Sequence, residues 1–400
     1  MRVGKVAGSE NERVLFWRIL FYILIVAYFN YSTVWPTDWW ARRSFVGAWW
    51  KLYADDPYWS PPDYAAWHRL VVRMDAPYWQ RIDAQPVYME ALPQRRQSAQ
   101  APAAQPLLAG AVFEEAVAAA VLLCAPQSQG AAYLGMLRCT NDEESLDRLL
   151  AAAMERAAES GCTRLIGPAG LVPAWGGGAL TNHFDQTPPI HTPYNPPYLA
   201  DLLATSMSVC QESVVLSLPV ISPLPQSQGP AVLTSLQLDE LVGAHWPLLQ
   251  AALAPHAPTP SIERDEASLL LQWIATAPTL GWLAQVEGAP VGFVVVQPDL
   301  APLLRRTGGG RLLPLRWFAA WARRRPVRRG RLLFGAVAPA WRRQGIGSQL
   351  LAQALHHAAG AGWTELACGP YAVATPAVSF LQRVGAYAKQ RYALFEWNGY

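Results

Sequence analysis

The alternation of apolar and polar stretches predicts a chain built from repeated strand–helix–strand units. Each unit has a short apolar run of strand length, then a segment with apolar residues at helical spacing, then a second apolar run. Two such units occupy 131–139, 141–160 and 163–166, and again 332–337, 348–357 and 364–368. This succession is typical of α/β folds, in which the helix crosses over between neighbouring strands.

The two units also resemble each other letter by letter. The first ends in Gly-Cys-Thr-Arg-Leu-Ile-Gly-Pro over 161–168, and the second has Gly-Trp-Thr-Glu-Leu-Ala-Cys-Gly-Pro over 362–370. In both, a G-x-T-x-L strand leads to Gly-Pro. A duplication of one α/β domain accounts for the pattern.

Between the two units the pattern predicts a domain boundary. Residues 214–220 look like a strand that closes the first domain, and 222–230, with three prolines and a glycine, read as a linker. We therefore divide the chain into a hydrophobic N-terminal segment and two domains joined by the linker. The ranges are 1–34, 35–221, 222–230 and 231–400.

The second domain has a readable order of elements. A strand near Val232 leads into helical patterns at 238–253 and 263–275. A hairpin follows over 282–296, with the turn Glu-Gly-Ala-Pro between its two strands.

Composition narrows the class of protein. The chain has 400 residues, of which 52% are hydrophobic and 15% charged, as in a globular protein with two or three domains. The net charge of +3 argues against a dedicated nucleic-acid binder. The five cysteines are scattered without C-x-x-C pairs, which favours neither a disulfide framework nor a metal site. A cytoplasmic location is the simplest expectation.

The N-terminal segment leaves membrane association open. Residues 14–34 are apolar and aromatic and follow several basic residues, as in a signal-anchor. The uninterrupted apolar part, 19–29, falls short of the ~20 residues that span a bilayer. Contact with the membrane, a hydrophobic helix docked on the core and a tail outside the fold are the alternatives.

The stretch with the clearest chemistry is the loop between strand 332–337 and the helix that follows. It reads Arg-Arg-Gln-Gly-Ile-Gly over 342–347. Glycines let the backbone approach an anion, and the helix N-terminus adds partial positive charge. The spacing matches neither a nucleotide P-loop nor a dinucleotide fingerprint. It predicts a site for a pyrophosphate.

The first domain differs at the equivalent position. Residues 140–145 read Thr-Asn-Asp-Glu-Glu-Ser, with Asn141 as the expected N-cap. Three carboxylates at a helix start stabilise the helix but repel a pyrophosphate. We expect no such site there.

Three further segments carry chemistry with open interpretations. The aromatic-rich stretch from Trp35 to Leu92 predicts core or the wall of an apolar site. The proline-rich segment 184–198 is a stiff loop that could line a polar pocket or serve only as a connection. Its candidate substrate residues are Asp185, His191, Tyr194 and Asn195. The arginine-rich 305–331 fits a solvated insertion, an anionic membrane, RNA or a phosphate equally well.

These motifs together resemble a known superfamily. R-x-x-G-x-G over 342–347, after a strand ending in V-x-P-x-W, resembles the acyl-CoA loop of the GNAT N-acetyltransferases. The whole chain from about residue 35 is similar to an uncharacterised bacterial family that pairs two GNAT-like domains. The segments that carry this likeness are 52–62, 184–198 and 288–300.

The resemblance implies a fold and an activity. It implies two tandem GNAT-like domains of the α/β (α+β) class, each a mixed, mostly antiparallel sheet flanked by helices. It implies acyl transfer from acetyl-CoA or another acyl-CoA to a small-molecule or peptide amine, by direct attack. The strand ending at Val337 would bulge and splay from strand 364–368. The residues that would hold the co-substrate are Ala336, Val337, Arg342, Arg343, Gln344, Gly345, Ile346, Gly347 and Ser348.

The likeness is incomplete at the catalytic positions. Aligned through Gly385, the asparagine and tyrosine that GNAT enzymes often carry are replaced by Ala374 and Leu381. Tyr371, Tyr387, Tyr392 or solvent could supply the missing acid, and Tyr371 and Glu365 are the weak candidates for acid and base. Two alternatives stay open. The protein could be a FemAB-like transferase using aminoacyl-tRNA, or an acyl-CoA-binding module that has lost catalysis.

Overall fold

The computed structural model describes most of the chain, in nine stretches. These are residues 31–74, 77–91, 116–125, 130–171, 177–221, 229–253, 263–275, 278–311 and 327–398. The strands are β1 (Tyr31–Val34), β2 (Asp83–Ala91), β3 (Ala116–Cys124), β4 (Ala131–Cys139), β5 (Arg164–Ala169), β6 (Ala179–Leu180), β7 (Ser208–Pro219), β8 (Val232–Leu236), β9 (Leu280–Val286), β10 (Ala289–Pro298), β11 (Arg329–Val337), β12 (Glu365–Ala372) and β13 (Tyr387–Asn398). The helices are α2 (Trp39–Lys51), α3 (Tyr64–His68), α4 (Pro77–Arg81), α5 (Glu143–Glu159), α6 (Tyr198–Ser206), α7 (Leu238–Val242), α8 (Trp246–Leu253), α9 (Arg264–Ile274), α10 (Ala301–Arg306), α12 (Ile346–Gly360) and α13 (Pro376–Arg383), with a π-helical turn at Arg69–Arg73 and a 3-10 turn at Pro339–Trp341.

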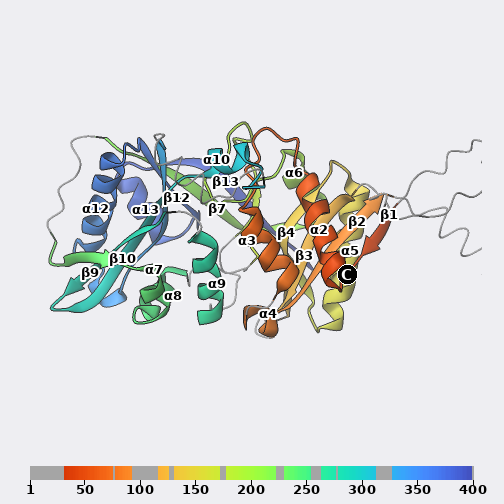
Figure 1. The fold of residues 1–400 in the computed structure, drawn as a ribbon, viewed down its shortest axis with the longest axis horizontal. Helices are drawn as coiled ribbons and strands as arrows, with labels where there is room; N and C mark the ends of the chain where they lie inside the picture. The colour runs from red at the N-terminus through yellow and green to blue at the C-terminus, as the bar shows by residue number, and fades with distance from the viewer. Residues whose placement is uncertain are drawn as a thin grey trace, which may run out of the picture.

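One sheet runs through both halves of the molecule (Figure 1). Across the described residues its order is β1-β2-β3-β4-β5-β13-β7-β12-β11-β10-β9-β8, with β6 paired to β13. Two neighbouring pairs are parallel, β4–β5 and β11–β12, and the rest are antiparallel. The predicted class, a mixed and mostly antiparallel sheet flanked by helices, is confirmed.

The halves exchange their last strands. We expected residues 214–220 to close the first domain, but β7 pairs with β12 of the second half and with β13. The C-terminal strand β13 takes the place beside β5 of the first half. Local patterns predicted the strand correctly and its neighbours wrongly, because pairing across more than a hundred residues leaves no trace in a local periodicity.

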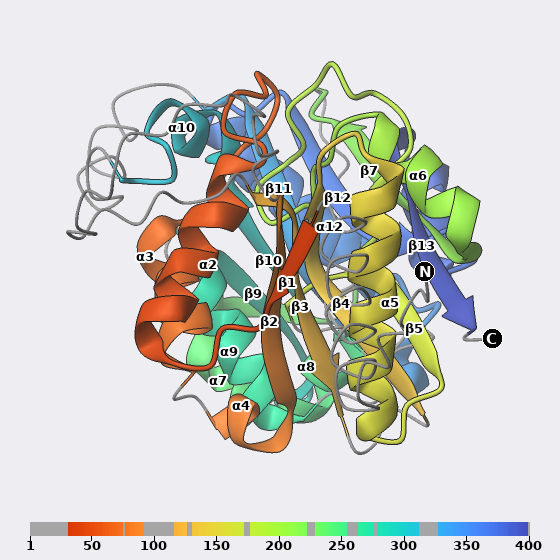
Figure 2. The ribbon, with the colours of Figure 1, turned by 90° about the vertical axis from the view of Figure 1, so that its right-hand side faces the viewer.

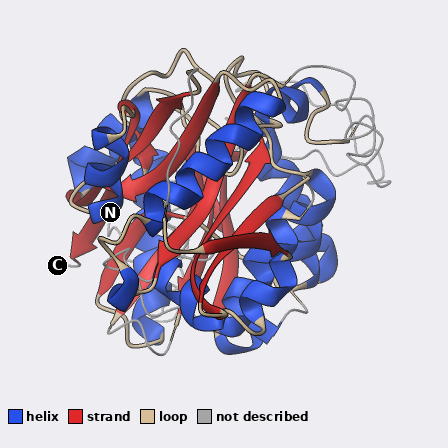
Figure 3. Cartoon of the chain, turned by 90° about the vertical axis from the view of Figure 1, so that its left-hand side faces the viewer, coloured by secondary structure: helices blue, strands red, loops and turns tan. Residues whose placement is uncertain are grey.

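Helices cover both faces of this sheet (Figures 2 and 3). On one face α2–α4 of the first half and α7–α9 of the second share a continuous apolar cluster with the sheet. On the other face α5 and α6 pack on the first half, and α12 and α13 on the second. The duplicated unit is therefore visible as β4–α5–β5 and β11–α12–β12. Both Gly–Pro peptide bonds that follow, at 167–168 and 369–370, are cis.

Most predicted elements are confirmed, with local corrections. The helix predicted over 141–160 begins at Glu143, so its N-cap is Asp142 rather than Asn141. The helix predicted over 238–253 is broken into α7 and α8, since Gly243 ends the first and Pro247 lies in the first turn of the second.

Several predictions fall partly or wholly outside the described residues. Residues 1–30, 93–106, 222–228 and 312–326 are among these. The last four residues of the apolar segment 14–34 form β1, which pairs antiparallel with β2. None of the helices in the described stretches combines the length and the apolar character needed to cross a bilayer.

Candidate functional site

The strand that precedes the glycine loop bulges and separates from its neighbour. In the pairing of β10 with β11, Val296 faces Leu332 and Val295 faces Phe334, so Leu333 is an extra residue. Between the described strands β11 and β12, pairing runs from Arg329 to Leu332 and then stops. The five residues from Leu333 to Val337 form an unpaired edge of ~16 Å. They are partly or fully exposed. This is the bulge and splay that the resemblance implied.

The loop after this edge turns sharply into α12. The Arg342 Nε donates to the Val337 carbonyl at 3.1 Å, and the side-chain Nε2 of Gln344 donates to the Ala340 carbonyl at 3.2 Å. Arg343 and Gly345 both have left-handed backbone angles, with φ of 64° and 83°. Gly345 is the N-cap of α12 and the glycine permits that conformation without strain.

The N-terminus of α12, here called its mouth, is not covered by a capping side chain of any described residue. No described side chain caps it, and its first turn holds no acidic residue. A Cβ built at Gly345 would meet no described atom within 4 Å, and one at Gly347 would make only ordinary contacts at 3.8 Å. Arg342, Arg343 and Ser348 are exposed beside it. The free amides, the helix dipole and two guanidinium groups fit a pyrophosphate.

The candidate catalytic residues occupy very different places along β12. Glu365 begins the strand, three residues before the last pair with β11. It accepts hydrogen bonds from Ser217 at 2.5 Å and from Lys389 at 3.1 Å. Burial would raise its pKa, but the hydrogen bonds from Ser217 and Lys389 prevail and lower it. Six residues of extended strand, ~20 Å, separate it from Tyr371, so the two candidates lie at opposite ends of β12.

Tyr371 lies beyond the point where β11 and β12 separate. In the sheet, Tyr371 pairs with Val214 of β7. Burial raises the pKa of its hydroxyl well above the ordinary value. A phenol held in the protonated form can donate a proton or a hydrogen bond but cannot act as a base. Tyr387 is 52% exposed at the start of β13, and Leu381 is a core residue of α13.

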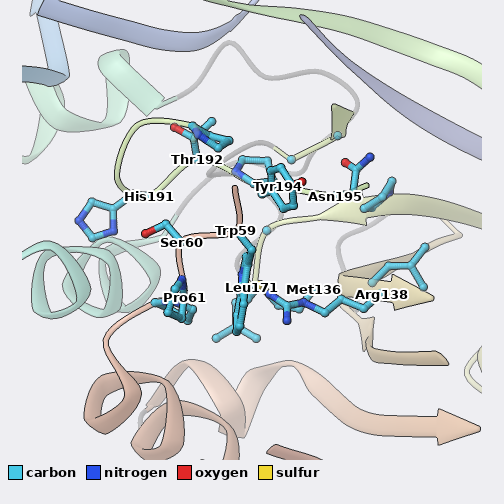
Figure 4. A pocket seen from close by; sticks show the side chains of 18 of the residues that line it. Trp59, Ser60, Pro61, Met136, Arg138, Leu171, His191, Thr192, Tyr194 and Asn195 are labelled. Carbon is cyan, nitrogen blue, oxygen red and sulfur yellow. The ribbon is translucent and has the colours of Figure 1, made fainter. Parts of the chain in front are cut away.

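A cavity lies on the face of the sheet opposite α12. Its volume is about 190 Å³. Its walls come from Trp49 of α2, residues 59–63, the end of β4, the end of β5 with the residues after it, and the loop residues 188–195, together with single residues of α6, α9, α10 and β12 (Leu199, Trp273, Leu304 and Pro370). Figure 4 shows these side chains converging from separate segments. Two of the three segments that carry the family likeness thus form its walls.

The third such segment holds the loop in place. Asp299 accepts hydrogen bonds from the backbone amides of Ile190 at 2.9 Å and Ala301 at 3.0 Å, and it pairs with Arg329. Arg329 also donates to the Thr187 carbonyl at 3.2 Å. On the other side Tyr194 donates to Asp56 at 2.6 Å.

The four substrate candidates of this loop divide into three groups. Asp185 is exposed and does not line the cavity. Tyr194 and Asn195 line it but are committed to structural hydrogen bonds, Tyr194 to Asp56 and Asn195 to the backbone of Leu180 and Pro196. His191 lines the cavity and accepts a hydrogen bond from the Trp273 indole at 2.8 Å. Burial, with a smaller contribution from the charge of Arg331, lowers its pKa to about 3, so the ring is neutral.

One residue of the cavity wall was not among our sequence candidates. Arg138, near the end of β4, is 5% exposed. Its guanidinium carbon lies 3.4 Å from the Trp49 ring centre, 4.3 Å from that of Trp59 and 4.7 Å from that of Tyr53. Burial lowers its pKa to about 9. The signal was present in the sequence, since an arginine interrupts an otherwise apolar strand.

The arginine-rich segment is partly structural. Among its described residues, Gly309 accepts a hydrogen bond from the Tyr64 amide at 2.8 Å. A Cβ there would come within 2.3 Å of the Pro62 carbonyl oxygen, so only glycine allows this contact. The start of the segment therefore docks onto the first half and is not a solvated insertion.

Comparison with known proteins supports the resemblance. Residues 246–386 match the sequence profile of the acetyltransferase (GNAT) family. Comparison with curated proteins found no matching sequence.

Solved structures share the fold over almost the whole chain. One is a tandem GNAT protein from the clavulanic acid biosynthesis pathway, at 13% identity and a TM-score of 0.56, covering 92% of this chain and 98% of that one. Another is a conserved protein of unknown function and probable N-acyltransferase from Enterococcus faecalis V583, at 7% identity, a TM-score of 0.53, and 92% and 72% coverage. A third is a GCN5-related N-acetyltransferase from Anabaena variabilis, at 8% identity, a TM-score of 0.51, and the same coverage.

Proposed function

We propose that this chain transfers an acyl group from acyl-CoA to an amine, because residues 246–386 match the acetyltransferase (GNAT) family. The observation that carries the proposal is the open mouth of α12 beside the unpaired edge of β11. An N-terminal helix turn with free amides suits the pyrophosphate, and an unpaired strand edge suits an extended arm with its own amides. Acetyl-CoA is the simplest donor, and a longer acyl-CoA would bind in the same way.

Different residues of the loop and of β11 would bind different parts of the acyl-CoA. The amides from Arg343 to Ser348 would hold the pyrophosphate, with the exposed side chains of Arg342 and Arg343 adding charge. The backbone of Ala336 and Val337 would pair with the extended arm. A free amide near Val337 would donate to the thioester oxygen, where negative charge develops during attack.

The reaction needs little beyond position. The amine nitrogen attacks the thioester carbonyl carbon, the carbon–sulfur bond breaks, and the nitrogen loses a proton as the sulfur leaves. The products are an amide and free CoA. Holding the amine beside the thioester supplies much of the acceleration. Tyr371, kept protonated by burial, is the group best placed along β12 to donate to the departing sulfur.

The acceptor would approach from the side of the cavity. α12 packs on one face of the second half, and α9 with its Trp273 packs on the other. A donor bound at the mouth of α12 and passing through the opening would present its acyl group on the face that carries the cavity. Pro370, in the splayed part of β12, is part of the cavity wall.

Calorimetry with acetyl-CoA tests the donor site. We expect micromolar-range binding to the native protein and its loss, by at least about a hundredfold, in Gly347→Glu. The carboxylate would face the pyrophosphate, while the same charge in the first turn of a helix favours folding, so loss of binding would not reflect unfolding. Gly347→Gln is the matched control, since it adds the same bulk without the charge and should bind more tightly than the glutamate variant.

Indistinguishable titrations of the native protein and the glutamate variant would contradict the proposal. Binding without turnover across a panel of amines would identify an acyl-CoA-binding module. Retention of aminoacyl-tRNA, without acetyl-CoA binding, would favour the FemAB-like alternative.

A further inference from the structure

Arg138 is a buried positive charge that the donor site does not use. Among the described residues its guanidinium makes one hydrogen bond, to the Trp49 carbonyl at 3.0 Å, and no ion pair. Three aromatic rings hold it instead. Cation–π contacts orient a guanidinium and keep it charged, but leave its remaining N–H groups free to donate.

The side chain of Arg138 borders the cavity, and most of the other cavity walls are apolar, with Trp49, Trp59, Leu171 and several prolines among them. Burying an unpaired cation beside an apolar space is costly unless something compensates for it. An anion with an apolar body would compensate for it fully.

No acidic side chain of the described wall is free to play that part. Asp63 lines the cavity, but it caps α3 by accepting from the Ala66 amide at 3.0 Å. Asp56 accepts from Tyr194. On the far side Arg331, 4% exposed, lies near His191 and adds a second buried positive charge behind the wall.

We infer that this cavity binds the acceptor, and that the acceptor is a small amine carrying a carboxylate, which Arg138 holds. The inference rests on the proposed acyltransfer and names its substrate class. A planar guanidinium with free N–H groups can bind a carboxylate through two parallel hydrogen bonds. The apolar walls contact the rest of the molecule, and the amine lies toward Pro370.

The size of the cavity limits the acceptor. About 190 Å³ is slightly more than the roughly 150 Å³ that accommodates benzene in an engineered apolar cavity. The space suits a molecule of amino-acid size. Free amino acids with an apolar side chain are the class that fits charge, polarity and volume together.

Binding of benzoate and benzamide to the full chain tests the anion site without any acyl transfer. The two probes have the same shape and differ in charge. We expect benzoate to bind at least about tenfold more tightly, since hydrogen bonds between charged groups are the stronger ones. Arg138→Gln should abolish that preference, whereas Arg306→Gln, an exposed arginine of α10, should retain it.

Folding controls keep the result interpretable. Arg138→Lys preserves the charge without the planar fork, so it should keep a smaller preference for benzoate and weaken its binding several-fold. Arg138→Gln and Arg138→Lys should both bind acetyl-CoA with the same affinity as the native protein. Equal affinity of the native protein for the two probes, or an unchanged preference in Arg138→Gln, would overturn the inference.

Turnover gives a second readout. With acetyl-CoA as donor, L-leucine should be acetylated with a higher kcat/KM than L-leucinamide, although the amide has the less basic and more readily deprotonated amine. Arg138→Gln should raise the KM for leucine at least about tenfold and leave the KM for acetyl-CoA unchanged. Faster acetylation of leucinamide by the native protein would contradict the inference.

The two proposals fail separately. Gly347→Glu should lose acetyl-CoA and still prefer benzoate to benzamide. Acetyl-CoA binding without a carboxylate preference would contradict the inference about the acceptor and would not contradict the proposed acyltransferase activity. A carboxylate preference without acetyl-CoA binding would leave an anion site in the cavity, and would remove the acyltransferase together with the acceptor role of that site.

Discussion

The two halves open their sheets at the same place and use the opening differently. In the first half β4 bulges after Gly135, where Arg138 pairs with Ala119 and Gly135 with Val121. Side chains then close the exposed edge. Trp49 donates to the Met136 carbonyl at 2.7 Å, and Tyr198 donates to the Cys139 carbonyl at 2.8 Å. In the second half the corresponding edge of β11 stays accessible.

The helix that follows each opening repeats the contrast. The second residue of α5 is Glu144, and the second residue of α12 is Gly347. The first turn of α5 carries carboxylates, whereas the first turn of α12 has no acidic residue and exposes its backbone amides. A duplicated scaffold thus holds one opening sealed by aromatic side chains, beside a cavity, and one opening free for a ligand with phosphates.

The largest effect is expected from removing the strand that joins the halves. Truncation after Ala386 deletes β13, which lies between β5 and β7. Both halves then lose a central neighbour, and we expect no cooperatively folded protein from either. Far-UV circular dichroism and thermal unfolding of the soluble fraction measure this. A first half that still melts cooperatively would show that the halves are independent.

A smaller effect is expected from the neutral histidine behind the first opening. The pKa of His191 is about 3 when folded, against an ordinary value near 6.5, so the unfolded chain binds more protons between these values. Stability is therefore fully present above about pH 6.5 and falls as the pH drops, by at most about 1.4 kcal/mol per pH unit.

Comparison with His191→Asn isolates this contribution. Asparagine tolerates the positive φ of 60° at this position and does not titrate. Urea unfolding at pH 7 and pH 5 should show a smaller loss for the variant than for the native protein. Equal losses would mean that His191 is not held neutral.

The smallest effect is expected from exchanging the helix mouths. Glu144→Gly gives α5 the residue that α12 has, and should lower stability by about 1 kcal/mol through the lost charge and the added backbone freedom. It should not create acetyl-CoA binding in Gly347→Glu, because aromatic side chains still seal the edge of β4. Thermal unfolding and calorimetry on the double variant check both statements. Restored binding would mean that the helix mouth alone decides.

Local chemistry was readable in the sequence where it depends on neighbours along the chain. Periodicity and residues 342–347 predict the strand β11, the glycine turn and α12. Periodicity and the turn at 287–290 predict the hairpin of β9 and β10. The exchange of β7 and β13 was not readable, because either strand satisfies the same apolar pattern beside either half. The cage around Arg138 joins Trp49 and Trp59 to β4, and their proximity is a product of the fold.

The continuity of the sheet also limits how the molecule can move. Two lobes joined by a flexible connection can swing apart to admit a ligand, but here the backbone hydrogen bonds of β7 and β13 run through the middle. Rigid-body opening would break those bonds. Entry into the cavity would therefore depend on surface segments that border it, such as the proline-rich loop 184–198, rather than on a separation of the two halves.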